Sequence, residues 1–564
     1  MPRTRRCDCW LYWTPHEAAS VHWIDAVVSC LTGRVAPRHA KRSARQLPID
    51  GFIVPKIPSL SVFAGLALCV LQLQSIATAD DQTPKKPNVL MIAIDDLNDW
   101  VQPLGGHPQV KTPAMQRLAS RGVTFTNAHC QAPLCNPSRT SIMTGRRPTS
   151  TGVYGLAPWI RNVDELSDLV TMPQHFSANG YKTLLGGKIH HGGHGRGKGS
   201  DAEADVWGPP ARVGAKPEKK LIPPTPGGNH PLMDWGTFPH RDEDKGDWVV
   251  ASWAVDQLDQ LSKTRDQPFF LAAGFFLPHV PCYVSQKWYD MYPFESLTMP
   301  PMPPGDRDDT PMSSWYIHWE LPEPRTSWLR ENSQLKNLTR SYLASVSFVD
   351  SQVGRILDQL DASGLSDSTI VVLWSDHGYH MGEKAVSGKN TLWQRSTRVP
   401  LIISVPNGLT DHQIAANVKC ESPAELLDLY PTLCELTGLS VPEGQEGLSL
   451  VPQLEDPADV RERPAICTHN AGNHSVCDTR WRYIVYADGG EELYDRAADP
   501  LEHRNLLAGD SDRSQYDSVV KRLSAYLPET EKPLAPGSAH RILEKRDDGF
   551  YWQDKKIVME DWVQ

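Results

Sequence analysis

The sequence predicts an α/β fold, with helices on both faces of a large sheet, followed by a smaller C-terminal α+β subdomain. Residues 88–94 and 369–374 are almost continuously apolar, a pattern typical of parallel strands buried on both faces. Each run ends in acidic residues, at the strand end where open α/β sheets bind their ligands. Beyond about residue 440 the pattern changes to shorter strands and turns.

Helix and strand patterns occupy the chain around these two runs. A helix is expected from Thr112, where Pro113 suits the first turn, and a second one begins near Pro173. Further helices are expected near 248–261, 334–360 and 425–436, with strands at 123–128, 181–185, 268–275 and 399–403. In the C-terminal part, the expected strands 482–486 and 492–495 and the helix near 511–527 predict a small antiparallel sheet.

Two segments, residues 201–245 and 296–330, are rich in Pro, Asp and Trp and show no clear period. We expect them to be long ordered loops over the active-site face, because loops of this length in a compact domain are usually functional.

The composition is that of a globular protein with a negative net charge. Hydrophobic residues make up 40% of the 564 residues, and the mean hydropathy of −0.42 argues against a bundle of membrane helices. The formal net charge of −10 gives no overall cationic field for nucleic acid. An anion-binding site must therefore be a local concentration of Arg, Lys and His.

Residues 1–79 are expected to lie outside the fold. The apolar run from Ser59 to Leu73 follows a basic residue and precedes small residues near Ala79, which is the pattern of a secretory signal peptide. The run is too short for a stable membrane span. The Arg-rich stretch upstream indicates a mis-assigned start, with translation beginning near Val54 or Pro55. We expect an exported protein, periplasmic or secreted, with a catalytic domain at 86–440 and a C-terminal subdomain at 441–564.

Export permits disulfide bonds among the seven cysteines that follow the leader. Cys467 and Cys477 are spaced to close a short loop, although pairing is not determined by sequence.

The stretch Cys135-Asn136-Pro137-Ser138-Arg139 is the strongest motif in the chain. The alternative interpretation of Cys135 is a half-buried thiol at the start of a helix, since Pro137 suits a first turn. The motif resembles the signature of the type I sulfatases. In that family the cysteine is oxidised to formylglycine (3-oxoalanine), an aldehyde whose hydrate, a gem-diol, is the nucleophile.

Two pairs of candidate metal ligands follow the two buried runs. Asp95 and Asp96 follow the first, and Asp376 and His377 follow the second. Because parallel strands end at one edge of a sheet, these four side chains can converge. Three carboxylates and an imidazole suit Ca²⁺ or Mg²⁺. The alternative for the aspartates is capping of the loops after the strands.

Basic residues near the same edge provide a candidate site for a sulfate-sized anion. Each follows a predicted strand or lies in a loop at that edge, although single basic residues are often only solvated and the histidine doublet with His194 could instead bind zinc. These residues are Arg139, Lys188, His190, His191, His279 and Lys389.

From about residue 86 to 510 the chain is similar to the iduronate-2-sulfatase branch of the sulfatases. The matching segments are 95–97, 135–139, 187–191, 278–281, 341–347, 375–378 and 492–500. The resemblance implies an alkaline-phosphatase-like α/β/α sandwich with a small C-terminal domain. It implies that one divalent cation, Ca²⁺ or Mg²⁺, is held by Asp95, Asp96, Asp376, His377 and the modified Cys135. The family's loop histidine matches either His190 or His191, and we favour His191.

The mechanism implied by the resemblance is hydrolysis of a sulfate ester on a saccharide. Arg139 and Lys188 hold the nucleophile, His279 and Lys389 neutralise the sulfate, and His191 removes a proton to release the product. The implied partners are a sulfated saccharide and a formylglycine-generating enzyme. A phosphatase or phosphonate-ester hydrolase of the same superfamily, or an inactive glycan-binding relative, is the alternative. The choice of sugar is expected to depend on residues 201–245 and 296–330 and on His469 and His474.

Overall fold

The computed structural model describes residues 86–196, 202–226, 230–509 and 512–559. These residues belong to one compact unit, Gln82–Gln564. The expected signal peptide and upstream start, residues 1–79, lie outside the described residues. No helix in the described ranges is both long enough and apolar enough to cross a membrane.

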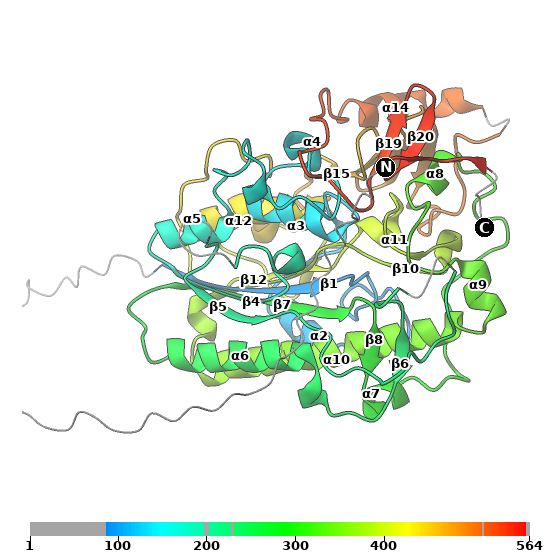
Figure 1. The fold of residues 1–564 in the computed structure, drawn as a ribbon. Helices are drawn as coiled ribbons and strands as arrows, with labels where there is room; N and C mark the ends of the chain where they lie inside the picture. The colour runs from blue at the N-terminus through cyan, green and yellow to red at the C-terminus, as the bar shows by residue number, and fades with distance from the viewer. Residues whose placement is uncertain (1–85, 197–201, 227–229, 510–511, 560–564) are drawn as a thin grey trace, which may run out of the picture. The chain divides into compact units, whose positions relative to one another are not determined.

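An eight-stranded sheet forms the centre of this unit (Figure 1). β1 (Asn88–Asp95) lies between β7 (Phe269–Pro278) and β9 (Thr369–Ser375) and runs parallel to both. The sheet is mixed, because β12 (Leu401–Ser404) runs antiparallel to both of its neighbours. The full order is β13 (Val418–Cys420), β2 (Val123–Phe125), β12, β9, β1, β7, β4 (Lys182–Gly187) and β5 (Val206–Pro210).

Helices cover both faces of this sheet, and the side chains of β1 explain why. Leu90, Ile92 and Ile94 join one hydrophobic core, while Val89 and Met91 join the other, as expected from the two-residue period of a strand. Figure 1 shows one set of helices below the sheet, formed by α2 (Pro113–Ala119), α6 (Gly246–Leu261) and α10 (Leu335–Ala362). The set above it is formed by α3 (Cys135–Thr144), α5 (Met172–Ala178) and α12 (Leu429–Leu436). The predicted α/β/α sandwich is confirmed.

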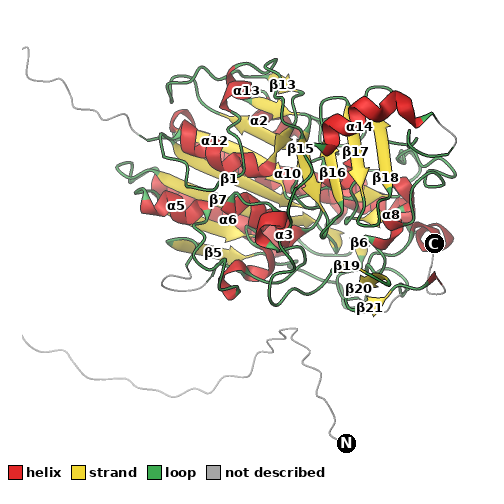
Figure 2. Cartoon of the chain, turned by 90° about the horizontal axis from the view of Figure 1, so that it is seen from above, coloured by secondary structure: helices red, strands yellow, loops and turns green. Residues whose placement is uncertain are grey.

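The C-terminal part contains the expected antiparallel sheet, with four strands (Figure 2). α14 (Asp517–Ser524) packs on it through Leu523, which shares a small core with Val476 and Leu493. A three-stranded antiparallel sheet follows. The strands are β15 (Ala465–Thr468), β16 (His474–Cys477), β17 (Trp481–Val485) and β18 (Glu491–Asp495), then β19 (Leu543–Arg546), β20 (Gly549–Trp552) and β21 (Lys555–Lys556).

Two sequence-based expectations differ from the structure. The presumed loop 201–245 contains β5 and also β6 (Trp235–Thr237), which pairs with β8 (Cys282–Val284). β5 contains two prolines, which made this segment resemble a loop in the sequence. Prolines are tolerated in this strand because β5 lies at the edge of the sheet. The other presumed loop, 296–330, contains the short helices α8 (Ser313–Tyr316) and α9 (Thr326–Glu331).

The disulfide considered between Cys467 and Cys477 is absent from the described residues, where both thiols are free. In the β15–β16 register Cys467 faces Ser475, and Cys477 faces Ala465. Cys467 Sγ lies 3.9 Å from Cys130 Sγ instead.

Candidate functional site

The ends of β1 and β9 bring the two predicted acidic pairs together. Ile94 pairs with Ser375 in the sheet, so the residues that follow them meet beyond the same edge. The backbone N–H of Asp96 donates to Asp376 Oδ1 at 3.2 Å. Asp95, Asp96, Asp376 and His377 are all fully buried.

Asp96 has a left-handed backbone, with φ of 60°, which is uncommon for a residue other than glycine. Tyr342 of α10 holds this turn, because its hydroxyl donates to the Asp96 carbonyl at 2.7 Å and accepts from the Asn98 N–H at 2.9 Å. Tyr342 is not among the site residues predicted from the sequence. Its only signal was a phenol on the apolar face of a predicted helix, inside a segment that matched the family.

Cys135 is the first residue of α3 and is 1% exposed. Its Sγ lies 3.2 Å from Lys389 Nζ, 3.3 Å from His377 Nε2 and 3.7 Å from Lys188 Nζ. Burial alone would raise the pKa of the Cys135 thiol, but Lys188 and Lys389 outweigh it and hold the pKa well below its usual range. The helix N-terminus adds amide donors and a positive dipole end. This position is therefore built to stabilise negative charge on residue 135.

Arg139 lies one helical turn after Cys135 and is 1% exposed. Its Nε donates to Asp376 Oδ2 at 2.8 Å and its Nη2 donates to Asp95 Oδ1 at 3.0 Å. Ser138 donates its hydroxyl to the Asp376 carbonyl at 2.6 Å. α3 is thus attached to the ends of both β1 and β9, and these contacts determine where Cys135 sits.

The loop after β4 carries Lys188 and the two histidines. Lys188 Nζ contacts the carboxylate of Asp95, and it is buried. Burial lowers the pKa of His191, while a hydrogen bond to Cys135 and the Cys135 charge oppose that change. His190 instead packs its ring edge-on against Trp159, with ring centroids 4.9 Å apart. The structure therefore places His191, and not His190, against Cys135.

His279 follows β7, which carries it to the same edge of the sheet. Asp247, in the first turn of α6, holds the preceding backbone by accepting from the N–H groups of Phe276 at 2.7 Å and Leu277 at 2.9 Å. Burial, together with Lys389 and Lys188, lowers the pKa of His279 to about 3, which keeps this ring neutral. Asp247 was not among the predicted site residues.

Lys389 lies in a short loop after β11 (Ser387–Gly388) and donates to Asp96 Oδ1 at 2.6 Å. Burial opposes its charge, but Asp96 and Cys135 prevail and raise the pKa of Lys389 well above its usual range. Lys389 is therefore a permanent cation beside residue 135.

The carboxylates repel one another unless a cation lies between them. Burial, reinforced by Asp95 and opposed by Lys389, raises the pKa of Asp96 to about 6. Burial also raises the pKa of Asp376 to about 7, against the charge of Arg139. Asp96 Oδ2 is buried and has no hydrogen-bond partner among the residues that the structure describes. A hard divalent cation fits this oxygen-rich donor set and would give that oxygen a partner.

Two overlapping groups of donor atoms have the spacing of a metal site. Within each group the donor atoms all lie within 4.8 Å of one another. The groups are Asp95, Cys135, Asp376 and His377, and Asp95, Asp96, Cys135 and His279.

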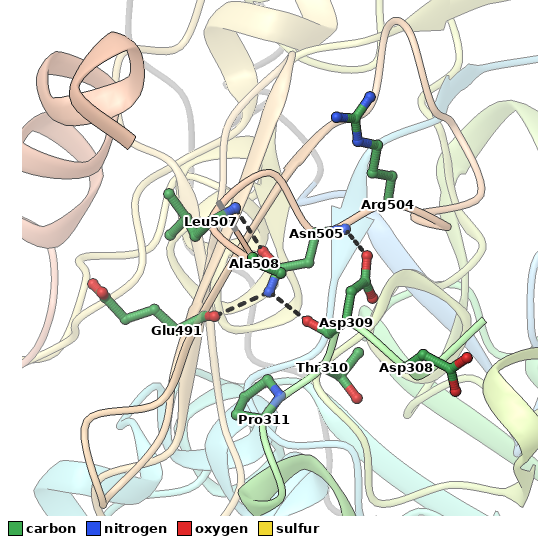
Figure 3. Close-up of a pocket in the computed structure, with 10 residues that line it drawn as sticks. Asp308, Asp309, Thr310, Pro311, Glu491, Arg504, Asn505, Leu507 and Ala508 are labelled. Carbon is green, nitrogen blue, oxygen red and sulfur yellow. Dashed lines mark hydrogen bonds between the residues drawn. The ribbon is translucent and has the colours of Figure 1, made fainter. Parts of the chain in front are cut away.

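Figure 3 shows a separate cavity of about 650 Å³. It is lined by Asp308–Pro311, Glu491, Arg504, Asn505 and Leu507–Gly509, and none of the predicted site residues borders it. Asn505 joins its two sides by donating to the carbonyls of Asp309 at 3.0 Å and Glu491 at 3.2 Å. Its carboxylates make it unsuited to a sulfate group.

Comparisons with known proteins agree with the resemblance seen in the sequence. Residues 87–439 match the model of the Sulfatase family, and residues 382–532 match the C-terminal region of N-sulphoglucosamine sulphohydrolase. A sulfatase of Formosa agariphila is 39% identical and covers 83% of this chain and 92% of its own. The mouse iduronate 2-sulfatase is 31% identical, covering 68% of this chain and 74% of its own. A phosphonate monoester hydrolase from Silicibacter pomeroyi has the same fold, with a TM-score of 0.64, 21% identity, and coverage of 84% of this chain and 100% of its own.

Proposed function

We propose that this chain, which belongs to the sulfatase family and is a sulfuric ester hydrolase, removes sulfate from a sulfated saccharide. The observation that carries the proposal is the convergence on Cys135 Sγ of Lys389, His377 and Lys188, at 3.2, 3.3 and 3.7 Å. The saccharide is supported by relatives whose names specify sugar sulfates, among them the mouse iduronate 2-sulfatase.

Cys135 is oxidised to formylglycine in this proposal, by a formylglycine-generating enzyme that acts before folding buries the residue. The hydrated aldehyde carries two hydroxyl groups, and one of them is the nucleophile. The low pKa of the Cys135 position supports this role, because Lys188 and Lys389, working against burial, favour an oxyanion as they favour a thiolate.

One divalent cation, Ca²⁺ or Mg²⁺, is held by Asp95, Asp96, Asp376 and His377, with residue 135 as a further ligand. When bound, such a cation supplies Lewis acidity that makes a neighbouring hydroxyl easier to deprotonate. The support is the set of mutually close donor atoms and the unpartnered Asp96 Oδ2.

The remaining residues have separate roles around the nucleophile. Arg139 and Lys188 orient residue 135 through contacts that tie them to Asp95 and Asp376. Lys389 and His279 face the incoming sulfate, where Lys389 neutralises its charge. The negative charge of the bound sulfate favours protonation of His279, which then donates a hydrogen bond to the departing oxygen. His191, beside residue 135, accepts a proton from the second hydroxyl so that sulfate is released. A plain thiol or serine lacks that second hydroxyl.

The protein is exported in this proposal. The signal-like run from Ser59 to Leu73 supports export to the periplasm or beyond, where polymeric sulfated saccharides are accessible.

The experiment is to express the chain with and without a formylglycine-generating enzyme and to assay an aryl sulfate beside an aryl phosphate. We expect hydrolysis of the sulfate only after co-expression, together with an aldehyde at residue 135 in the peptide mass spectrum. Cys135→Ala should abolish turnover and leave the fold intact. Full activity from protein whose residue 135 is entirely thiol would overturn the mechanism, and preference for the phosphate would overturn the function.

A further inference from the structure

Arg541, in the segment that leads into β19, reaches the loop that carries Lys389. Its Nη1 donates to the side-chain oxygen of Asn390 at 2.8 Å. Asn390 directly follows Lys389, whose Nζ is 3.2 Å from Cys135 Sγ. Figure 1 shows β19 and β20, in red, on the same side of the large sheet as α3. The C-terminal segment therefore contributes a cation to the wall of the active site, some 150 residues after the Lys389 loop.

The backbone around Arg541 is held in an unusual conformation. His540 and Arg541 both have left-handed φ angles, of 63° and 66°. Strained backbone of this kind persists where the surrounding structure fixes it, and it is concentrated at functional sites. The His540 carbonyl accepts from the Leu156 N–H at 3.2 Å, and the Arg541 carbonyl accepts from Asn470 Nδ2 at 3.2 Å.

The segment around Gly155, which contacts the backbone before Arg541, also contacts the residue that follows Cys135. Asn136, the residue after Cys135, donates to the carbonyls of Gly155 at 3.1 Å and Pro158 at 3.0 Å. A side chain at Gly155 would collide with the carbonyls of Ala539 and His540, both 2.8 Å from its Cβ position. The position of Arg541 is thus determined by the same contacts that surround Cys135.

The negative charge of Glu323 offsets the positive charge of Arg541. The guanidinium is therefore better suited to hydrogen bonds with a ligand than to binding a free anion in addition to the sulfate group. Glu323 lies beside it, with Arg541 Nη2 donating to Oε1 at 3.4 Å and Nη1 3.3 Å from Oε2. Burial would raise the pKa of Glu323, but Arg541 and Lys389 lower it, so the carboxylate is ionised. Glu323 is 2% exposed and Arg541 is 12% exposed, so the guanidinium is the group of this pair that is open to a ligand.

The segments expected from sequence to choose the substrate meet at this point. His230, from 201–245, lies near enough to Glu323 and Arg541 for both charges to act on its pKa, which burial lowers. Glu323 itself comes from 296–330. Of the two C-terminal histidines considered earlier, His469 contacts Asn390 at 3.3 Å, whereas His474 pairs with Glu531.

We propose that Arg541 is a specificity-determining residue that donates hydrogen bonds to an acceptor oxygen on the sugar bearing the sulfate ester. The acceptor is a ring hydroxyl or a ring carboxylate, and Glu323 and Asn390 hold the guanidinium in place. The inference rests on the proposed sulfatase function and names its substrate class. An arginine with spare N–H groups suits sugar oxygens, and a site built to hydrogen-bond a substrate discriminates strongly against analogues that lack the partner.

The test compares Arg541→Ala and Arg541→Gln with the parent enzyme on three substrates. These are an aryl sulfate, a neutral sulfated monosaccharide and a sulfated hexuronate. We expect Arg541→Ala to lower kcat/KM on a saccharide substrate at least about tenfold, mainly through KM. Turnover of the aryl sulfate, which has no ring oxygens to bind, should change less than about threefold. Recovery by Arg541→Gln would identify a hydroxyl acceptor, and failure to recover on the hexuronate would identify a carboxylate.

Arg546→Gln is the matched control, since Arg546 ends β19, the strand that follows Arg541, but pairs with Glu544 and Asp554 at the surface. It should behave like the parent on all three substrates. Equal losses on the aryl sulfate and the saccharides would overturn the inference, because Arg541 would then act only by positioning Lys389. Unchanged saccharide kinetics in Arg541→Ala would also overturn it. A parent enzyme that hydrolyses none of the three would instead refute the proposed function, and the inference with it.

Discussion

Arg139 Nε donates to Asp376 Oδ2 at 2.8 Å, and both side chains are at most 1% exposed. This ion pair attaches the helix that begins with Cys135 to the end of β9. Because Arg139 also pairs with Asp95, one guanidinium couples the helix of the candidate nucleophile to two neighbouring strands. The candidate nucleophile and the candidate metal ligands are therefore positioned by the same contact.

Asp376→Asn should lower metal affinity and activity by more than about 100-fold. The reason is the loss of one of three carboxylates in a buried site. Substituting a residue that only hydrogen-bonds to a metal ligand already lowers them by about 10–100-fold. Calcium titration calorimetry and aryl sulfate turnover measure the two effects. Asp358→Asn is the control and should match the parent, because Asp358 is an exposed carboxylate on α10 that pairs with Arg117 of α2. Parent-like calcium affinity in Asp376→Asn would remove Asp376 from the ligand set.

Tyr342→Phe should lower metal affinity and turnover by about 10–100-fold, because the left-handed turn at Asp96 loses the hydroxyl that holds it. The buried N–H of Asn98 also loses its partner, at a cost of about 1–3 kcal/mol in unfolding free energy. Tyr292→Phe is a close control, since its hydroxyl is likewise buried between Ser347 and the Lys111 N–H. It should reduce stability similarly while leaving calcium affinity unchanged. Equal effects of both variants on calcium affinity would contradict a positioning role for Tyr342.

His191→Ala and His190→Ala should fail in different ways. If His191 accepts the proton that releases sulfate, His191→Ala still attacks the ester and then accumulates a sulfated form of residue 135. Intact mass spectrometry after a brief exposure to substrate would detect it. His190→Ala should show no such form and a smaller loss of activity, because the His190 ring packs on Trp159. The adduct appearing in His190→Ala alone would exchange the two roles.

Glu425→Gln should remove stability that depends on pH. Arg147 forms a two-pronged pair with Glu425, with both N–O distances at 2.7 Å. Burial alone would raise the pKa of Glu425, but Arg147 lowers it from 4.5 to about 2. A depressed folded-state pKa gives stability that is present above pH 4.5 and is lost as pH falls toward about 2.

At pH 7 the free energy of unfolding of Glu425→Gln should therefore be about 3 kcal/mol lower than that of the parent. This is the cost expected when one partner of a buried ion pair is removed and the other charge is left unpaired. Denaturant titrations at several pH values should show the difference shrinking below pH 4.5. A difference that stays constant down to pH 2.5 would show that Glu425 contributes through packing rather than charge.

Much of the site could be predicted from sequence because its chemistry lies in short local patterns. The apolar runs before Asp95 and Asp376 predicted strands that end at one edge of the sheet, and the Cys135 motif predicted a nucleophile at the start of a helix. These patterns are local because a strand buried on both faces must be continuously apolar, and a ligand pair must follow its strand immediately.

Other residues acquired a role only in the tertiary structure. Tyr342 meets Asp96 from 246 positions away, and Arg541 meets Asn390 from 151 positions away. Tyr342 lies in a segment that matches the family, but nothing in that segment indicates a contact with Asp96. Arg541 lies in no pattern that distinguishes it from other paired arginines.

The α/β class, the sulfatase family and the cluster of acidic and basic residues at one sheet edge all follow from local sequence patterns. The loop histidine that faces Cys135, the hydroxyl that holds Asp96 and the C-terminal side chain that borders the site do not. These three relationships depend on how α10, the β4 loop and the β19 segment pack against the sheet. That packing depends on how side chains from distant segments fit together, so it cannot be predicted from short stretches of the chain.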